Sequence, residues 1–222
     1  QFFDVTVSDG AGGAIVVWED QREFPATFYA QRIDGYGRPK WALDGVPLAP
    51  APTLDGQEPA RVVTDGAGGA IVVWNDFRNS IEEPFCQRVD SSGVVRWTAN
   101  GVRVCAATDD IVRFDVAADG AGGMIVAWQD KRNGNLNPDI FVQRLSPDGV
   151  PLWVANGVAL CTDRGVQQSP LVVVDDLGSA IVASACTETR SESVASLPQL
   201  CASSRLEPEA PPKCGTSVTI CT

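Results

Sequence analysis

The sequence predicts an all-β chain made of four copies of one unit, and three observations support this prediction. Thirteen residues recur almost unchanged, as SDGAGGAIVVWED, TDGAGGAIVVWND and ADGAGGMIVAWQD. A worn fourth copy, VDDLGSAIVASAC, keeps the phase, since Asp9, Asp65, Asp119 and Asp175 lie 56, 54 and 56 residues apart. The rest of the unit also repeats, because YAQRIDGYGRPKW is matched by FCQRVDSSGVVRW and FVQRLSPDGVPLW.

Each repeat contains the signals for four short strands. A first strand such as RVVTD ends at an Asp-Gly/Gly-Gly turn, whose glycines reach positive φ without steric cost. The second strand, AIVVW, is apolar on both faces, which is typical of a strand covered on both sides. A polar loop leads to a third strand such as FVQRL, and a tight turn leads to a fourth that opens on Trp and ends on GVALC.

A four-stranded unit of this length, apolar on both sheet faces and repeated in tandem, indicates a β-propeller, in which sheets pack face to face around an axis. We predict a single domain that closes as a four-bladed propeller. The alternatives are an open β-repeat array and part of a larger propeller. The domain covers residues 1–222, with repeats at approximately 1–56, 57–110, 111–166 and 167–222.

The repeat resembles a known group of proteins. Its order of D-G-x-G-G, four apolar residues, W-x-D-x-R, then Q-R, G, W and G-V, is similar to the tandem repeats of large secreted or surface proteins of bacteria. The resemblance covers essentially the whole chain, and it implies a propeller-like fold without an established catalytic activity. The fourth repeat departs most, because Ser184 replaces the tryptophan and the W-x-D-x-R motif is lost.

Charge and composition argue against several classes of function. A net charge of −11 repels phosphate backbones and anionic lipid, so we expect neither a nucleic-acid partner nor membrane insertion. The absence of histidine excludes Ser-His and Cys-His catalysis and histidine-ligated zinc. The seven cysteines, without a Cys-x-x-Cys motif, favour disulfides in an oxidising compartment. We therefore expect an extracellular or cell-surface protein, with the periplasm as the alternative.

Charged residues recur at fixed positions in the repeats, and we interpret them as structural. An aspartate at the end of each second strand is expected to bind an arginine of the third strand across the hairpin. The rival interpretation is a ring of charged groups that binds a carboxylate or a sugar, and repetition in every unit argues against it. The expected ion pairs join Asp20 to Arg32, Asp76 to Arg88, and Asp130 to Arg144.

The cysteines suggest one specific bond. In the fourth repeat Cys186 takes the place of the missing aspartate, and Cys201 falls where the partner strand begins. We expect a Cys186–Cys201 disulfide to replace the ion pair there. Sequence does not fix the other connectivities, and seven cysteines leave one thiol free or paired with another chain.

The six tryptophans occupy two positions per repeat. Those in the second strands are expected in the core, because tryptophan buries a large apolar area. Core packing is also favoured for the set that opens the fourth strands, with sugar stacking as the alternative. The first set is Trp18, Trp74 and Trp128, and the second is Trp41, Trp97 and Trp153.

The segment DKRNGNLNPD is the least repetitive stretch, and its alternating side-chain oxygens resemble a calcium loop. It matches no complete calcium-loop pattern, and Asn-Gly and Asn-Pro are ordinary turn formers. We therefore expect no cofactor, with calcium as a weak alternative. The candidate ligands are Asp130, Asn133, Asn135, Asn137 and Asp139.

No pair of carboxylates stands out from the repeating scaffold, as glycoside hydrolysis would require. We therefore predict a non-catalytic structural or adhesive protein, a subunit of a surface assembly or filament or a module of a larger secreted protein. Its expected partners are further copies of itself or other surface proteins. The alternative is a carbohydrate-binding, lectin-like propeller with glycans as partners, and a glycosidase-type enzyme is the least favoured interpretation.

Overall fold

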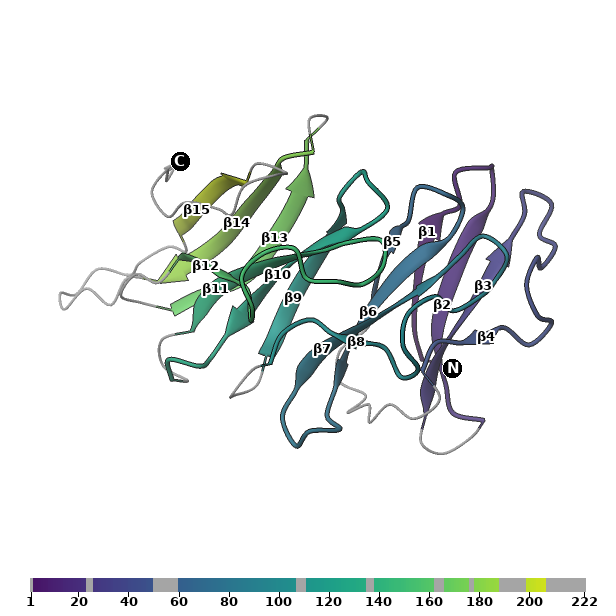
Figure 1. Ribbon diagram of the computed structural model, residues 1–222, viewed down its shortest axis with the longest axis horizontal. Coiled ribbons are helices and arrows are strands. Elements are labelled where there is room, and N and C mark those ends of the chain that lie inside the picture. The colour runs from purple at the N-terminus through teal and green to yellow at the C-terminus, as the bar shows by residue number, and fades with distance from the viewer. Residues whose placement is uncertain are drawn as a thin grey trace.

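The computed structural model consists of β-strands joined by turns and loops (Figure 1). No helix in the described part of the chain is long and apolar enough to cross a membrane. The structure describes residues 2–22, 26–49, 60–106, 111–134, 138–161, 166–175, 178–187 and 199–206.

The strands form four antiparallel sheets, each a meander in chain order. The first contains β1 (Phe2–Ser8), β2 (Ala14–Asp20), β3 (Thr27–Ile33) and β4 (Val46–Pro47). The second contains β5 (Arg61–Thr64), β6 (Ala70–Asp76), β7 (Glu83–Val89) and β8 (Val102–Arg103). The third contains β9 (Ile111–Ala118), β10 (Met124–Asp130), β11 (Asp139–Leu145) and β12 (Val158–Cys161). The fourth contains β13 (Val166–Val174), β14 (Ala180–Thr187) and β15 (Gln199–Leu206).

The register of the strands repeats from sheet to sheet. Trp74 lies opposite Phe85 in the second sheet, as Trp128 lies opposite Phe141 in the third. The worn fourth repeat keeps this register from Ala180 to Ser184, since Arg205 lies opposite Ile181 as Arg144 lies opposite Ile125. The register then shifts between Ser184 and Ala185. The prediction of an all-β chain with four antiparallel sheets is therefore confirmed.

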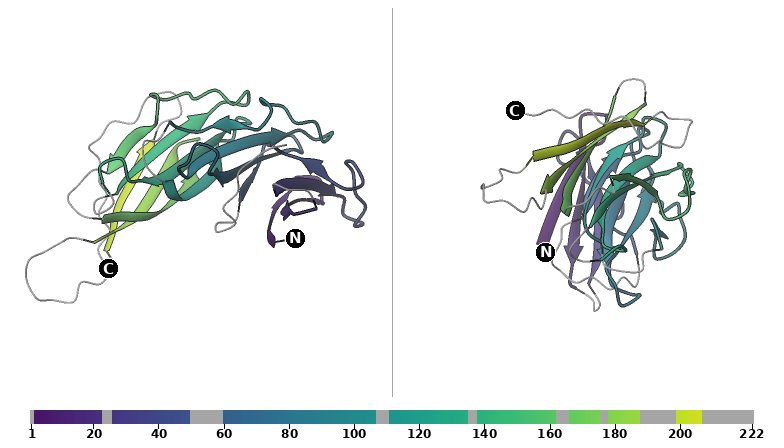
Figure 2. Two further views of the ribbon diagram at one scale, coloured as in Figure 1. Left: turned by 90° about the horizontal axis from the view of Figure 1, so that it is seen from below. Right: turned by 90° about the vertical axis from the view of Figure 1, so that its left-hand side faces the viewer.

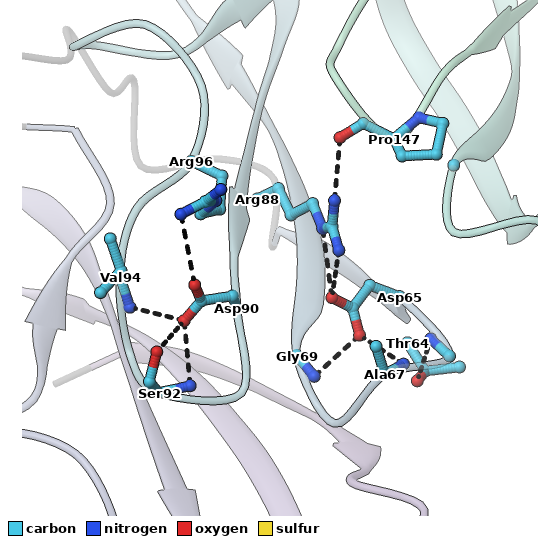
Figure 3. Close-up of polar contacts among 12 residues, drawn as sticks. Thr64, Asp65, Ala67, Gly69, Arg88, Asp90, Ser92, Val94, Arg96 and Pro147 are labelled. Carbon is cyan, nitrogen blue, oxygen red and sulfur yellow. Dashed lines mark hydrogen bonds and ion pairs between the residues drawn. The ribbon is translucent and has the colours of Figure 1, made fainter.

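The Asp-Gly turn between the first and second strands is built around its aspartate (Figure 3). One carboxylate oxygen of Asp65 accepts hydrogen bonds from the backbone N–H groups of Ala67 and Gly69, at 2.9 and 2.8 Å. The other oxygen binds Arg88 at 2.9 Å. A Cβ at Gly69 would collide with the carbonyl oxygen of Val89, so no other residue fits there. The motif recurs because each part of it has a structural task.

The expected ion pairs have the wrong partners. Arg88 binds Asp65 of the turn, whereas Asp76 binds Arg78 two residues further along the chain. The register explains the difference, because Asp76 lies opposite Glu83 and Arg88 lies at the other end of the hairpin. The same correction holds in the other two repeats, where Arg32 binds Asp9, Asp20 binds Arg22, Arg144 binds Asp119 and Asp130 binds Arg132.

The sheets pack face to face through apolar side chains, and both central second strands, β6 and β10, are buried along their whole length. Trp74 and Trp128 are 1% and 0% exposed. Arginine and tryptophan also link neighbouring sheets, since Arg88 and Trp97 both donate to the carbonyl oxygen of Pro147 in the next sheet. These contacts fix the order and spacing of the sheets.

The closed ring that we predicted is not found. β1 packs against β5, β5 against β9, and β9 against β13, so the sheets follow one another around a common axis. The described strands of the first and fourth sheets make no comparable contact with each other. Figure 2 shows the result, an open arc whose first and last sheets lie at opposite ends.

Candidate functional site

The two ends of the sheets differ in chemistry. At one end lie the Asp-Gly turns, which recur from repeat to repeat. At the other, which we call the loop end, each second strand finishes and the third begins. The residues that face each other across the hairpins there are Asp20 and Thr27, Asp76 and Glu83, and Asp130 and Asp139. The first residue of each pair is aspartate in all three sheets, whereas the second residue differs. The repeats therefore differ in sequence at the loop end.

The variable position is occupied by three buried polar residues with different partners. The Thr27 hydroxyl donates to the carbonyl oxygen of Ala49. Glu83 forms an ion pair with Arg103 and accepts a hydrogen bond from the Asn79 side chain at 2.7 Å. The Thr27 and Glu83 side chains are therefore committed to the scaffold.

Asp139 is in a different situation. It is 1% exposed, and its Oδ2 accepts a hydrogen bond from the Nδ2 of the exposed Asn133 at 2.5 Å. Its Oδ1 is buried without a hydrogen-bond partner among the described residues, and none of their cations forms an ion pair with it. Burial raises the pKa of Asp139, and the charge of Asp130 adds to the increase, while the Asn133 hydrogen bond opposes it. These effects shift the equilibrium of the Asp139 side chain toward its protonated form, relative to an exposed aspartate.

Asp130, across the hairpin from Asp139, is held in the opposite state. Burial alone would raise its pKa, but hydrogen bonds from Arg132 and from the Trp128 indole at 2.8 Å outweigh burial and lower it. Two adjacent carboxyl groups whose pKa values are driven apart are the usual arrangement for general acid–base work, one ionised and one able to donate a proton. Because Asp20 and Asp76 have the same kinds of partner as Asp130, the unusual member of the pair is Asp139.

Asp139 faces the second sheet. It lies on the same side of the third sheet as Trp128 and Phe141, which pack against Val73 and Cys105. Burial raises the pKa of the Cys105 thiol to about 12, and the charge of Asp130 contributes. Glu82 lies on the second-sheet side of the boundary between the second and third sheets. Its backbone carbonyl accepts a hydrogen bond from the N–H of Ile111, and Ile111 lies opposite Asp130 in the pairing of β9 with β10. Glu82 and Asp139 thus approach the same inter-sheet boundary from different sheets.

The loop end also carries an exposed aromatic side chain. Phe77 directly follows β6 and is 42% exposed. Asn79, two residues further along the same loop, and Asn133, in the loop between β10 and β11, are also exposed. Aromatic rings, amides and carboxyl groups are the kinds of side chain that bind polyhydroxylated ligands, because a ring covers C–H groups while polar groups bind hydroxyls.

The calcium hypothesis gains no support from the residues that the structure describes. Asp130 is committed to Arg132, and Asn133 presents its NH₂ group, not its oxygen, to Asp139. Among the described residues no group of three or more Cys, Asp or Glu side chains could hold a metal ion. Asn135 and Asn137 lie outside the described residues.

The tryptophans proposed for sugar stacking are mostly enclosed. Trp41 and Trp97 are buried, and each contacts a glycine of the following sheet's turn, Gly93 and Gly149. Their indole N–H groups donate to carbonyls of the same turns. Trp153 is half-buried at the boundary with the fourth sheet. The stacking surface is therefore absent at the first two positions.

The structure describes only some of the cysteine side chains on which the disulfide predictions depend. Cys86 and Cys105 are free and buried. Their common environment is the apolar boundary between the second and third sheets. Cys186 lies opposite Gln199 in the β14–β15 register, but the side chains of Cys186 and Cys201 lie outside the described residues. The expected disulfide stays a prediction.

No known protein family matches the sequence, and no curated protein matches it either. Several solved structures do match the structure of this chain. A putative glycoside hydrolase from Parabacteroides distasonis has a TM-score of 0.51 at 12% identity, over 98% of this chain and 72% of that one. A putative glycosidase from Bacteroides thetaiotaomicron has a TM-score of 0.49 at 11% identity, with the same coverages.

A third structure is that of an N-acetylgalactosamine deacetylase from F. plautii in complex with blood group B trisaccharide. Its TM-score is 0.41 at 12% identity, and the match covers 82% of this chain. The chain spans 62% of the length of this deacetylase. At these identities the likeness to the P. distasonis structure is a likeness of fold.

The expectation of a non-catalytic structural or adhesive protein is contradicted by this comparison. The P. distasonis protein, which has a similar fold with a TM-score of 0.51, is a putative glycoside hydrolase. The sequence prediction considered Asp139 only as a weak calcium ligand and did not single out Glu82. Asp139 and Glu82 break the repeat at the loop end, where the corresponding residues of the first sheet are Thr27 and Ala26.

Proposed function

We propose that this chain is a carbohydrate-processing catalytic domain, or part of one, that cleaves a glycosidic bond at the loop end between the second and third sheets. In this proposal Asp139 donates a proton to the oxygen of the leaving sugar. Glu82 supplies the second carboxylate. The fold shared with the putative glycoside hydrolase from P. distasonis supports the substrate class.

The chemistry requires one carboxyl group that is protonated before reaction and one that is ionised. Asp139 fits the first role because it is buried, forms no ion pair with a described cation and has a raised pKa. Its hydrogen-bond donor among the described residues is the exposed Asn133, which a substrate can displace from the solvent side. The burial of Asp139 without an ion pair to a described cation is the single observation that carries the proposal. The corresponding residues of the first and second sheets, Thr27 and Glu83, bind other groups of the scaffold.

The second carboxylate must act on the anomeric carbon, either directly or through a water molecule. Glu82 is half-buried and is held at the boundary by the hydrogen bond from the Ile111 N–H to its carbonyl, at 2.9 Å. It belongs to a different sheet from Asp139, and in this proposal the sugar binds between the two side chains. Phe77, on the same loop as Glu82, offers its ring to the apolar face of that sugar.

The test is a screen of the purified chain against aryl glycosides and oligosaccharides, with product anomers followed by NMR. For any substrate that is cleaved, Asp139→Asn and Glu82→Gln should each lower kcat by about 10²–10⁴-fold, the usual contribution of general acid–base catalysis. Asp148→Asn is the matched control, because Asp148 is exposed at the opposite end of the third sheet. Circular dichroism confirms that each variant folds.

Full activity in the Asp139→Asn variant would refute the assignment of the proton donor. Failure of the wild-type chain to cleave any member of the panel would refute the proposed activity itself. The stereochemistry of the product then identifies how the second carboxylate works, since retention requires a covalent intermediate and inversion requires an activated water.

A further inference from the structure

The first and last sheets of the arc each have one face that no described neighbour covers. β6 and β10, in the central sheets, are buried at every residue, whereas β2 alternates between half-buried and buried side chains. In the fourth sheet Leu171 and Val173 are 62% and 59% exposed. Exposed apolar side chains in neighbouring positions of one sheet are uncommon in a protein that acts alone.

The three internal boundaries all have the same direction. In each, the face that carries isoleucine in the second strand packs on the face of the next sheet that carries tryptophan or its equivalent. We call these the trailing face and the leading face. The pairs are Ile15 and Val17 with Val72 and Trp74, Ile71 and Val73 with Val126 and Trp128, and Ile125 and Ala127 with Ala180 and Val182.

One of the two uncovered faces is a trailing face, and the other is a leading face. Leu171 and Val173 lie opposite Ala183 and Ile181, and Ile181 has the register position of Ile125, so this surface is the trailing face of the fourth sheet. In the first sheet the uncovered side is the leading face. It contains Ala14, Val16 and Trp18, which are half-buried, while the corresponding Ala70, Val72 and Trp74 are buried.

We propose that the trailing face of the fourth sheet binds the leading face of the first sheet of a second copy of this chain. The new boundary continues the series of three that already exists within the chain, with the same kinds of side chain on both sides. A second copy brings its leading face in the correct orientation because the repeats of both copies run in the same direction. The interface is heterologous, so each copy uses two different surfaces.

Charge should make this association depend on salt. The chain carries a net charge of −11, so two copies repel each other at low ionic strength. The faces themselves are uncharged over Leu171, Val173 and Ile181 on one side and Ala14 and Val16 on the other. Association is therefore expected to strengthen as salt screens the repulsion, since the Debye length falls from about 30 Å at 0.01 M to about 8 Å at 0.15 M.

A heterologous interface can be tested by complementation. Leu171→Glu places a charge on the trailing face, and Val16→Glu places one on the leading face. Each change should weaken self-association about 100-fold or more, because a charge would be buried without a partner. Val94→Glu is the control, since Val94 is an exposed residue of a turn outside both faces. Sedimentation velocity over a range of concentrations measures the assembly, and circular dichroism verifies folding.

An equimolar mixture of Leu171→Glu and Val16→Glu should form a one-to-one dimer. The first variant keeps an intact leading face and the second keeps an intact trailing face, so one native boundary can form and growth stops there. A wild-type chain that stays monomeric at all concentrations, or a mixture that stays monomeric, would overturn the proposal. If the wild type is monomeric and both substitutions lower its free energy of unfolding, the proposal would be overturned. The two faces would then contact each other within one chain.

Discussion

Replacement of Asp65 by alanine tests whether the repeated aspartate holds the sheets together. In the native turn the carboxylate accepts hydrogen bonds from two backbone N–H groups and binds Arg88, whose guanidinium also donates to Pro147 of the third sheet at 3.0 Å (Figure 3). The substitution removes the anion and leaves buried donors without acceptors. Arg88 then also lacks the partner that orients it toward the next sheet.

The magnitude follows from the burial of the pair. The side chain of Asp65 is 0% exposed and that of Arg88 is 18% exposed. Breaking a buried ion pair by removing one member costs about 3–5 kcal/mol. For a chain of this length, each kcal/mol lowers the melting temperature by about 2–4 °C, so a loss of about 6–20 °C is expected.

Asp90 provides a matched control within the same part of the molecule. It accepts hydrogen bonds from the N–H groups of Ser92 and Val94 in an equivalent turn, but its partner Arg96 is 56% exposed at 3.7 Å. Exposed pairs contribute about 0–1 kcal/mol, so Asp90→Ala should be much milder. Thermal and urea unfolding of the two variants measures the difference. Equal losses would refute the argument that the buried link between sheets matters more than the local turn.

Three further outcomes follow. Asp139→Asn should be more stable than the wild type at neutral pH. Because folding raises the pKa of Asp139, the contribution of this side chain to stability is full below its unfolded pKa and falls as pH rises through its folded pKa. The difference in melting temperature should therefore shrink toward pH 4, and a constant difference would contradict this reasoning. Gly157→Ala should cost about 2–4 kcal/mol in urea unfolding because its Cβ would collide with the Trp128 ring, whereas Gly120→Ala, with nothing within 4 Å, should cost about 1 kcal/mol. Equal costs would exclude the steric explanation. Cys86 and Cys105 should resist iodoacetamide in the folded chain and react after unfolding, since burial raises both thiol pKa values, and mass spectrometry of labelled peptides would reveal any early reaction.

The repeat made most of the fold predictable from the sequence. The four strands of the first three units, the Asp-Gly turn and the buried second strand all follow from local patterns that recur in the repeats. Gly157 shows why the pattern is strict, since its positive φ and its contact with Trp128 both require glycine. The partners of the ion pairs were wrong because both aspartates lie near a hairpin end, and only the register decides which arginine each one meets.

Closure of the arc and the candidate site depend on information that the repeat does not contain. Whether the first and fourth sheets meet depends on the angle between successive sheets, which adds up over the whole chain. Asp139 was singled out as a calcium ligand because of its neighbours in sequence. Its difference from Glu83, which pairs with Arg103, becomes visible only when the two adjacent sheets are compared in space. Departure from the repeat at the loop end is the sequence signal that could have found it.

The pH dependence of kcat/KM for a cleaved glycoside, measured on the wild type and on Asp139→Asn, tests the proposed catalytic role most directly. A proton donor acts only while protonated, so wild-type activity should fall as pH rises through the pKa of Asp139, and the raised pKa extends activity toward neutral pH. The account predicts that this alkaline limb disappears in the variant together with most of the activity. A variant that keeps both the rate and the alkaline limb would contradict it.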